Sequence, residues 1–442
     1  ACNTLRLLPH PCSYARRLQL QNRIMKSRII YTLLVHLCLI PAVHAQSVVE
    51  PEFDPQEGTA HEVKLFGNGY YLSSGTPIRF MSKFTKGGFI DSTLKSDVLS
   101  DLRKNNRIGA EIHTGVEYYA HRIPFFKSSG WSWYFGASYH MNYNAAYSKN
   151  LFQLAFFGNR GFAGQTVELG PLNANVLSYG KLSAGAFNKE TKSRIALSLV
   201  AGQQFSQLNV DRALFYTAGN GSQLDLDLSE QFRSSDTSHR TGKINGWGSA
   251  ADFVLYFNTG SNKSLKINQG FRVALEDFGF IRWNANSITQ KKDSAYRYEG
   301  FEVTDLLNGI NQPFNVDNLN DTLGIKGTTG AQTHMLPLTF SVAAITETFS
   351  DKKVQAFYGF RLRALSNYTP MIHLGMQFNP IHDLALSLYG AFGGYGGFRA
   401  GLSASGKIGE HIRYGFCTGN IAGWISKNAY GRDFSLTIST RF

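Results

Sequence analysis

Charged side chains recur at alternate positions in segments whose intervening residues are apolar, and these side chains are the best placed to act on a solute. In an extended segment alternate side chains share one face, so each row would line one wall of a common interior. The rows of the C-terminal third are basic and contain Arg361, Arg363, His373, Arg399, His411, Arg413 and Arg441. The earlier rows are mostly acidic and contain Glu111, His113, Glu117 and Asp252.

These rows allow two interpretations. If they face an open lumen, the basic wall would attract anionic solutes into a polarised pore. Alternatively, the charges pair with one another and fill a narrow interior, as in barrels with little internal space. We favour the second interpretation, because loops that fold inward would leave a barrel of this size limited space.

Two other patterns suggest chemistry less strongly. Asp225 and Asp227 alternate with leucines, but a calcium site needs several further oxygen ligands at set spacing, and none follows. We therefore predict a solvated strand there. The glycine-rich run 390–397 lacks the G-x-G-x-x-G pattern and its strand-to-helix context, so we predict a tight external turn. The sequence predicts no cofactor and no metal site.

The sequence contains neither of two common catalytic motifs. Neither G-x-S-x-G nor H-E-x-x-H occurs, and His113, His121 and His140 are candidate bases only because histidine commonly is one. We expect no enzymatic activity. A serine and a histidine within hydrogen-bond reach on the outer face would instead favour an enzyme at the membrane surface.

The C-terminal residues show the element that would position these charges. One row of the final strand is apolar and contains Phe434, Leu436, Ile438 and Phe442, with Thr440 among them. The other row is polar, from Ser435 to Arg441. This alternation fits a wall with lipid outside and water inside. The apolar row with its terminal aromatic residue also resembles the insertion signal that outer-membrane barrels present to the barrel-assembly machinery.

The same period of two recurs along the chain in segments of about ten residues, the length of a tilted membrane strand. Aromatic residues make up 13% of the chain and glycines number 44, which suits a transmembrane barrel with aromatic girdles. We predict an all-β, transmembrane antiparallel β-barrel of about 14 strands, within a range of 12 to 18. Before the C-terminal third, strands are expected near 108–122, 131–144, 174–187, 193–208, 245–257, 264–283 and 335–349, with one more before residue 81.

The expected connections differ between the two ends of the barrel. If the final strand ends in the periplasm, the turns on that side are short and the external loops are long, the asymmetry known for such barrels. The long loops are 81–107, 145–173, 209–244 and 284–334. Within the first of them, Leu94, Val98 and Leu102 have helical spacing, and Asp91 or Ser92 could cap the helix. We predict a short helix near 91–106, on or inside the barrel.

The N-terminal residues predict a targeting segment. Residues 25–45 combine a basic start, a short apolar stretch and a small-residue cleavage site, so we expect a signal peptide cut after Ala45. We expect residues 1–24 to be an untranslated or disordered upstream segment and 46–442 to be the barrel. The segment up to Ala45 carries six basic residues and no acid, so its removal lowers the net charge of +13 and argues against nucleic-acid binding. Cys417 then remains the single cysteine, which excludes an intrachain disulfide.

Several strings together resemble a known family. They are LRKNNRIGAE at 102–111, FFGNRG at 156–161, LEDFGFIRW at 275–283 and the pair Leu336-Pro337 at the start of a strand. With the barrel pattern, the chain resembles a family of Bacteroidota outer-membrane proteins of unknown function. That family is similar in build to the fatty-acid-transporter-like barrels of 14 strands. The resemblance implies a location in the bacterial outer membrane and brings no activity or site residues.

Two functions follow as hypotheses. The first is a passive channel or binder for a small hydrophobic or anionic solute. The second is a structural or accessory subunit that presents long external loops to an outer-membrane protein partner; an interfacial enzyme is a third and weaker alternative. Outer-membrane lipid is the expected surrounding in each case. The content of the lumen separates the first two, because a plugged lumen without a lateral gap favours the scaffold.

Overall fold

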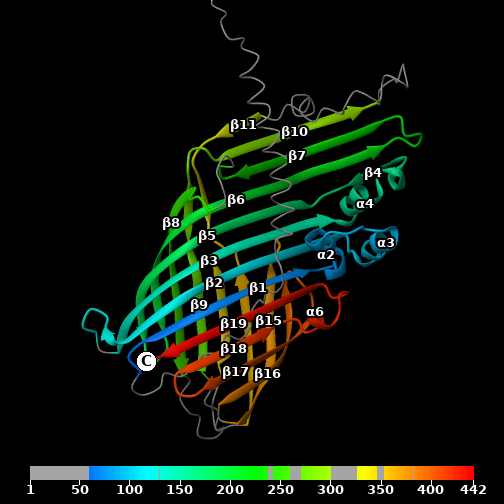
Figure 1. Cartoon of the computed structure of the whole chain (residues 1–442). Coiled ribbons are helices and arrows are strands. Elements are labelled where there is room, and N and C mark those ends of the chain that lie inside the picture. Colours follow the sequence, from blue (N-terminus) through cyan, green and yellow to red (C-terminus); the bar gives the residue numbers. More distant parts are fainter. Residues whose placement is uncertain are drawn as a thin grey trace, which may run out of the picture.

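The computed structural model of this chain describes residues 59–128, 130–236, 242–258, 270–299, 326–345, 353–381 and 383–442. They form one antiparallel sheet that closes on itself (Figure 1). The predicted signal peptide and upstream segment lie outside the described residues. No helix among the described residues is long and apolar enough to cross a membrane.

Within the described residues, 14 strands make up the barrel wall, which confirms the predicted architecture and strand number. In order around the wall they are β1 (Glu62–Ser73), β2 (Asn105–Pro124), β3 (Trp131–Ser148), β5 (Leu172–Asn188), β6 (Arg194–Thr217), β8 (Gly246–Asn258), β9 (Gly270–Trp283), β13 (Thr339–Ile345), β14 (Val354–Arg363), β15 (Thr369–Ile381), β16 (Leu384–Gly394), β17 (Arg399–Ile408), β18 (Ile412–Thr418) and β19 (Gly431–Arg441). Each strand pairs with the next, and β19 pairs with β1 from Glu62↔Arg441 to Leu72↔Gly431, which closes the wall.

The wall is apolar outside and polar inside. In β19 and the residue that follows it, the side chains of Leu436, Ile438 and Phe442 are exposed, whereas Ser439 and Arg441 between them are buried. β15 shows the same alternation, with exposed Leu374 and Met376 on its outer face. A closed antiparallel sheet with a lipid-compatible exterior satisfies every backbone group without water. The chain is therefore a bacterial outer-membrane β-barrel.

The two ends of the barrel differ as predicted. At the end that holds the start of β1 and the end of β19, strands such as β17 and β18 are joined by a tight turn. The opposite end carries long connections with structure of their own, and we assign it to the cell exterior because external loops are the long ones. These connections contain α2 (Ile78–Lys86), α3 (Ser92–Asp101), α4 (Lys149–Phe157), a 3₁₀ turn η1 (Arg160–Phe162), α6 (Ala422–Ile425), β4 (Gln165–Glu168), β7 (Leu224–Ser234), β10 (Ile288–Tyr298), β11 (Lys326–Thr329) and β12 (Gln332–Met335).

The predicted short helix is α3. The Asp91 side chain caps it by accepting a hydrogen bond from the Leu94 amide at 2.7 Å. The helix ends at Asp101 and not at 106, because Asn105 and Asn106 already belong to β2. Its apolar face, with Leu94 and Val98, packs with α2 and α4 in one cluster at the outer rim. It therefore lies on the barrel and does not fill it.

The outer halves of β5 and β6 continue beyond the wall as an extension sheet. There β6 pairs with β7 from Ser206 to Thr217, and β7 pairs with β10 along its whole length. Figure 1 shows β7, β10 and β11 standing beyond β8. Asp225 and Asp227 lie in β7, so the predicted strand extension at these residues is present.

Candidate functional site

A cavity of about 150 Å³ lies inside the barrel. Strands from most of the wall line it, and their charged side chains face one another across it. The charged residues that line it are Lys64, Glu111, Glu117, Lys181, Arg194, Asp252, Glu276, Asp277, Arg361 and Arg363. They comprise five carboxylates and five cations, so the charges of these side chains sum to zero when the lining histidines are neutral.

The centre of the site is a lysine held by two carboxylates. Lys181 Nζ of β5 lies 2.9 Å from Asp252 of β8 and 2.6 Å from Asp277 of β9. The backbone explains why both acids face inward. Asp277 has a φ of 58°, and the pairing of β8 with β9 shifts register between Ala251 and Phe253. The extra residue of this bulge turns Asp277 to the lumen, where its amide donates to Asp252 at 2.9 Å.

A second group joins strands nearer the periplasmic end. Glu117 of β2 accepts from Arg194 of β6 at 2.5 Å and contacts Lys64 of β1 at 3.2 Å. Next to the seam that closes the barrel, Glu62 pairs with Arg441 at 2.9 Å. The acids of both pairs are buried. Their desolvation is offset because each carboxylate has a cationic partner.

One ion pair crosses the lumen. Arg363 of β14 contacts Glu111 of β2 and also reaches Tyr70 of β1 at 3.3 Å and Asn142 of β3 at 3.5 Å. β2 and β14 are diametrically opposite, since six strands lie between them in either direction around the wall. We call the pair Arg363–Glu111 the clamp. It narrows the barrel on the external side of the cavity.

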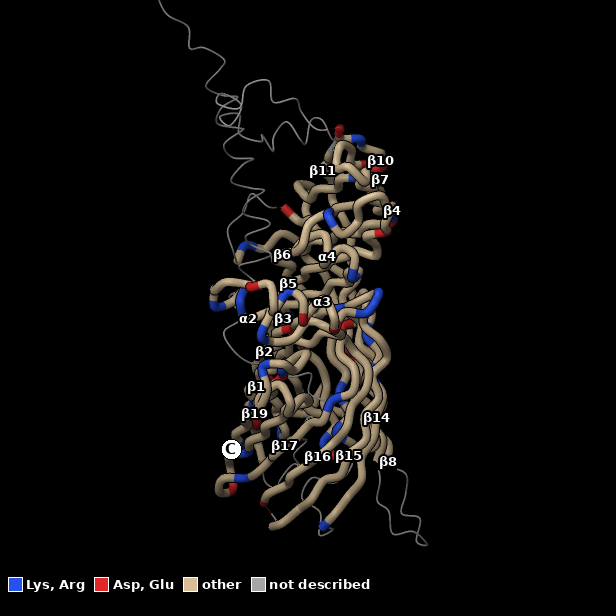
Figure 2. The backbone as a smooth tube through the Cα atoms, turned by 90° about the vertical axis from the view of Figure 1, so that its right-hand side faces the viewer, with Lys and Arg blue, Asp and Glu red and all other residues tan. Residues whose placement is uncertain are grey.

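The basic rows predicted from the sequence lie on β14, β15, β17, β18 and β19. No carboxylate occurs within the strands from β14 to β18, whereas β19 contains Asp433. The Lys and Arg residues of this part of the wall lie on β14, β17 and β18, and Figure 2 marks all Lys and Arg positions in blue. Arg361 of β14 lines the cavity, and no hydrogen bond or ion pair of its guanidinium is found within the described residues. The other four cations that line the cavity each have a carboxylate partner. Arg361 is thus the cation available to a solute.

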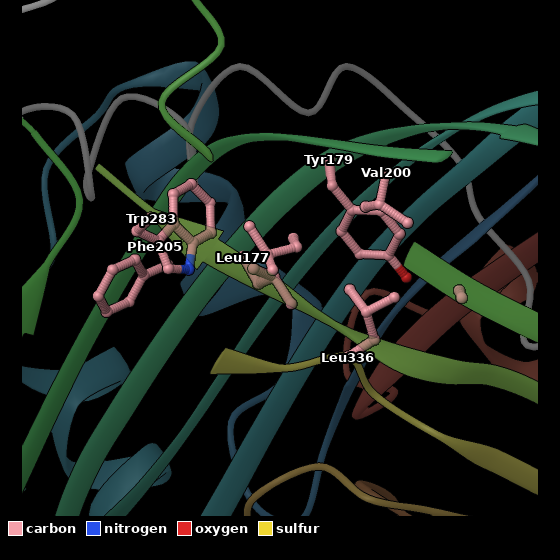
Figure 3. Close-up of a cluster of buried hydrophobic side chains, with 8 residues drawn as sticks. Leu177, Tyr179, Val200, Phe205, Trp283 and Leu336 are labelled. Carbon is pink, nitrogen blue, oxygen red and sulfur yellow. The ribbon is translucent and has the colours of Figure 1, made fainter. Parts of the chain in front are cut away.

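Buried apolar side chains gather at the external ends of β5, β6, β8 and β9. Figure 3 shows Leu177, Phe205, Trp283 and Leu336 of this cluster, which comes from β5, β6, β8, β9 and the connection before β13. A smaller cavity of about 70 Å³ remains beside it. Arg107 of β2 also donates to the backbone of the β16–β17 loop. No residue of 81–107 belongs to the apolar cluster, and Arg107 is the residue of that segment that contacts the β16–β17 loop.

The structure places the sequence candidates as follows. Arg361, Arg363, Glu111, Glu117 and Asp252 line the cavity together with His113. The side chains of His373, Arg399, Arg413 and Arg441 are buried on inward positions without lining it. His411 differs from the expectation: it is exposed in the turn before β18. The alternation had assigned it to the lumen because the strand was extended one residue too far.

Sequence reasoning missed several members of the site, chiefly Lys181, Arg194, Glu276 and Asp277. Lys181 had a usable signal, since it alternates with Gly180 and Leu182 in the same way as the charges that were selected. Asp277 had no such signal in the sequence, because strict alternation cannot place both Glu276 and Asp277 on one face without the bulge.

A serine–histidine pair is present, but inside the lumen. Ser138 Oγ lies 3.0 Å from His140 Nε2 on β3. His140 Nδ1 is 4.0 Å from Asp277, beyond hydrogen-bond distance. The His140 ring is stacked between His113 and Tyr179 with centroids at 3.9 and 4.5 Å. The described residues contain no group of three His, Cys, Asp or Glu side chains able to hold a metal ion.

The comparisons with known proteins cover most of the barrel. The sequence profile of a group described as "Family of unknown function (DUF5723)" matches residues 64–414. No curated protein matches the sequence. A FadL homologue of Pseudomonas aeruginosa is similar over 87% of this chain and 90% of its own, with 12% identity and a TM-score of 0.35. The toluene transporter TbuX of Ralstonia pickettii is similar over 87% of this chain and 89% of its own, with 9% identity and a TM-score of 0.36. The translocator domain of the autotransporter NalP from Neisseria meningitidis is similar over 97% of this chain and 98% of its own, with 8% identity and a TM-score of 0.30.

Proposed function

The chain belongs to this family of unknown function, and we propose that it is an outer-membrane barrel that binds or conducts a small hydrophilic solute with a negatively charged group. The observation that carries the proposal is Arg361, a cation that lines the cavity without a hydrogen bond or ion pair within the described residues. An anionic group that reached it would gain charge-assisted hydrogen bonds.

The lining argues against the hydrophobic solute that the sequence left open. Ten charged side chains surround the cavity, and an apolar solute would displace the water that hydrates them without replacing its hydrogen bonds. The size sets a second limit. A cavity of about 150 Å³ holds on the order of ten water molecules, so it fits one solute of at most about ten non-hydrogen atoms.

Uptake by proteoliposomes tests the proposal. Purified barrel in liposomes should admit small carboxylates such as propionate faster than neutral molecules of similar size. Arg361→Gln should remove this preference, whereas Lys407→Gln, a lumen-side base outside the cavity lining, should retain it. A preference for anions that survives Arg361→Gln would contradict the proposal.

A scaffold is the second candidate, and two observations favour it. Buried apolar side chains fill space at the external ends of β5, β6, β8 and β9, and the extension sheet stands beyond the wall. Recording in planar bilayers separates the candidates. Stable single-channel steps would support passage. Silence, together with unchanged solute uptake by liposomes with and without the barrel, would support the scaffold.

We propose no catalytic role for the Ser138–His140 pair. The third group of a catalytic triad would have to hydrogen-bond the histidine, and here Asp277 is committed to Lys181. Hydrolysis of a small chromogenic ester by the purified barrel should equal that of Ser138→Ala. A rate that falls in this variant would indicate an enzyme.

We also propose that the outward row with Phe442 is read by the barrel-assembly machinery. The Phe442 side chain is exposed, and its ring packs against His61 with centroids 5.6 Å apart. Deletion of Phe442 should greatly reduce the heat-modifiable barrel in the outer-membrane fraction. Normal amounts of folded barrel in that fraction would reject this role.

A further inference from the structure

We infer that the solute of the cavity is a zwitterion, with an anionic group on Arg361 and a cationic group on Glu276. The inference rests on the proposed function and specifies its solute class. It starts from the charge balance of the lining. The five carboxylates and five cations around the cavity cancel, so a solute with one charge would leave the filled cavity with a net charge. A zwitterion would leave it neutral.

The positive pole of the cavity is Arg361. It stands on the wall of β14 to β18, which contains no carboxylate within its strands. The neighbouring cation Arg363 is already bound to Glu111. An entering carboxylate can therefore pair with Arg361 without breaking an existing ion pair. The flat guanidinium suits a carboxylate because it can donate two parallel hydrogen bonds.

The negative pole is Glu276 of β9. The other carboxylates of the lining are held closely, as Asp252 and Asp277 are by Lys181 at 2.6 to 3.0 Å. Glu276 makes only long contacts, at 3.8 Å to Arg194 and 3.7 Å to Arg272. Charge-assisted hydrogen bonds are normally about 2.7 to 2.9 Å long. Its side chain is also 31% exposed, compared with 10% for Asp277. Glu276 can thus accept an ammonium group.

The two poles face the same cavity from strands separated by one other. Ser341 of β13 pairs with Arg361 on one side and with Ala274 on the other, and Glu276 is the next inward residue beyond Ala274. The backbones of β9 and β14 are therefore about 10 Å apart. Two long side chains that extend over the cavity leave between them the length of a small amino acid.

Equilibrium dialysis with matched probes tests the inference. Full-length barrel in nanodiscs would be dialysed against radiolabelled β-alanine, propionate and propylammonium, which share their carbon chain and differ in charge. β-Alanine should bind at least about tenfold more tightly than either of the others, since each end contributes a contact. Glu276→Gln should reduce the affinity of the barrel for β-alanine to its affinity for propionate. Arg361→Gln should reduce it to the affinity for propylammonium.

The controls separate binding from folding. Lys407→Gln and Arg297→Gln remove cations that do not line the cavity and should leave all three affinities unchanged. Heat modifiability and far-UV circular dichroism verify that every variant is folded. Propionate that binds as tightly as β-alanine, or β-alanine binding that survives Glu276→Gln, overturns the inference and leaves the proposed function intact. Absence of binding by all three probes overturns both.

Discussion

The lumen and the extension sheet both contain ion pairs between antiparallel strands, yet the two regions place them in opposite surroundings. Lys181 and its two carboxylates in the lumen have side chains no more than 10% exposed. In the extension, Arg212 pairs with Asp227 and Asp293, and these side chains are 37 to 69% exposed. A buried carboxylate depends on its partner, whereas an exposed one is hydrated without it. The same kind of ion pair is therefore required for stability in the lumen and contributes little to stability in the extension sheet.

The largest effect should come from removing a buried cation. Lys181→Met leaves Asp252 and Asp277 adjacent and uncompensated, so the barrel should lose about 3–5 kcal/mol of unfolding free energy. Urea unfolding in detergent micelles measures the loss. Arg212→Met in the extension is the matched control and should change little. Equal losses in both variants would remove the distinction between the regions.

The clamp tests coupling across the lumen. Arg363→Gln and Glu111→Gln should each destabilise the barrel, while the double variant should lose less than the sum of the two. The coupling free energy expected from such a double-mutant cycle is about 1–3 kcal/mol. The double variant should also raise single-channel conductance, since it opens the narrow level of the lumen. Additive losses of stability with unchanged conductance would mean that Arg363 and Glu111 are not coupled and do not limit the width of the lumen.

Packing can be compared at two glycines. A Cβ at Gly401 of β17 would lie 2.2 Å from the Tyr389 ring, whereas a Cβ at Gly219, in the turn before β7, meets nothing within 4 Å. Gly401→Ala should therefore destabilise the barrel by about 1–3 kcal/mol through overpacking. Gly219→Ala should leave the thermal unfolding midpoint where it is. If neither substitution changes the stability of the barrel, the lumen is more loosely packed than the contacts indicate.

The smallest effect is expected at Asp225. A hydrogen bond from Arg297 holds the pKa of this carboxyl below its usual value. Its contribution to stability is therefore present above the unfolded-state pKa of about 4 and is lost only as the pH falls below it. Asp225→Asn should produce no shift of the unfolding midpoint beyond experimental scatter at pH 7. A clear shift that disappears in high salt would show that the exposed pairs do stabilise the extension.

The sequence predicted what depends on a period of two. The strand number, the asymmetry of the two ends and the inward rows that contain Glu111 and Arg363 all follow from alternation, because a wall between lipid and water imposes it on each strand. It could not predict what depends on pairing between distant strands. That Arg363 reaches Glu111, or that Arg361 has no partner within the described residues, is set by the position of β14 opposite β2.

Local departures from regular geometry were also hidden. The bulge at Asp277 adds one residue to β9, and nothing in the composition of the segment marks it. The helices α2 and α4 were not predicted, since each is only nine residues long and is stabilised by aromatic contacts with the other, such as Phe80 with Phe152. Their formation depends on tertiary packing rather than on helical propensity.

The clamp also links the interior to the bilayer. Acyl chains exert lateral pressure on the outer surface of the barrel. The clamp joins the opposite strands β2 and β14 and should resist deformation of the wall under that pressure. The register shift near Asp252 and Asp277 is one of several places where the regular ladder of the wall is interrupted. Bilayers of different thickness or tension should therefore alter the width of the cavity, so the lipid itself becomes a variable that sets which solutes fit.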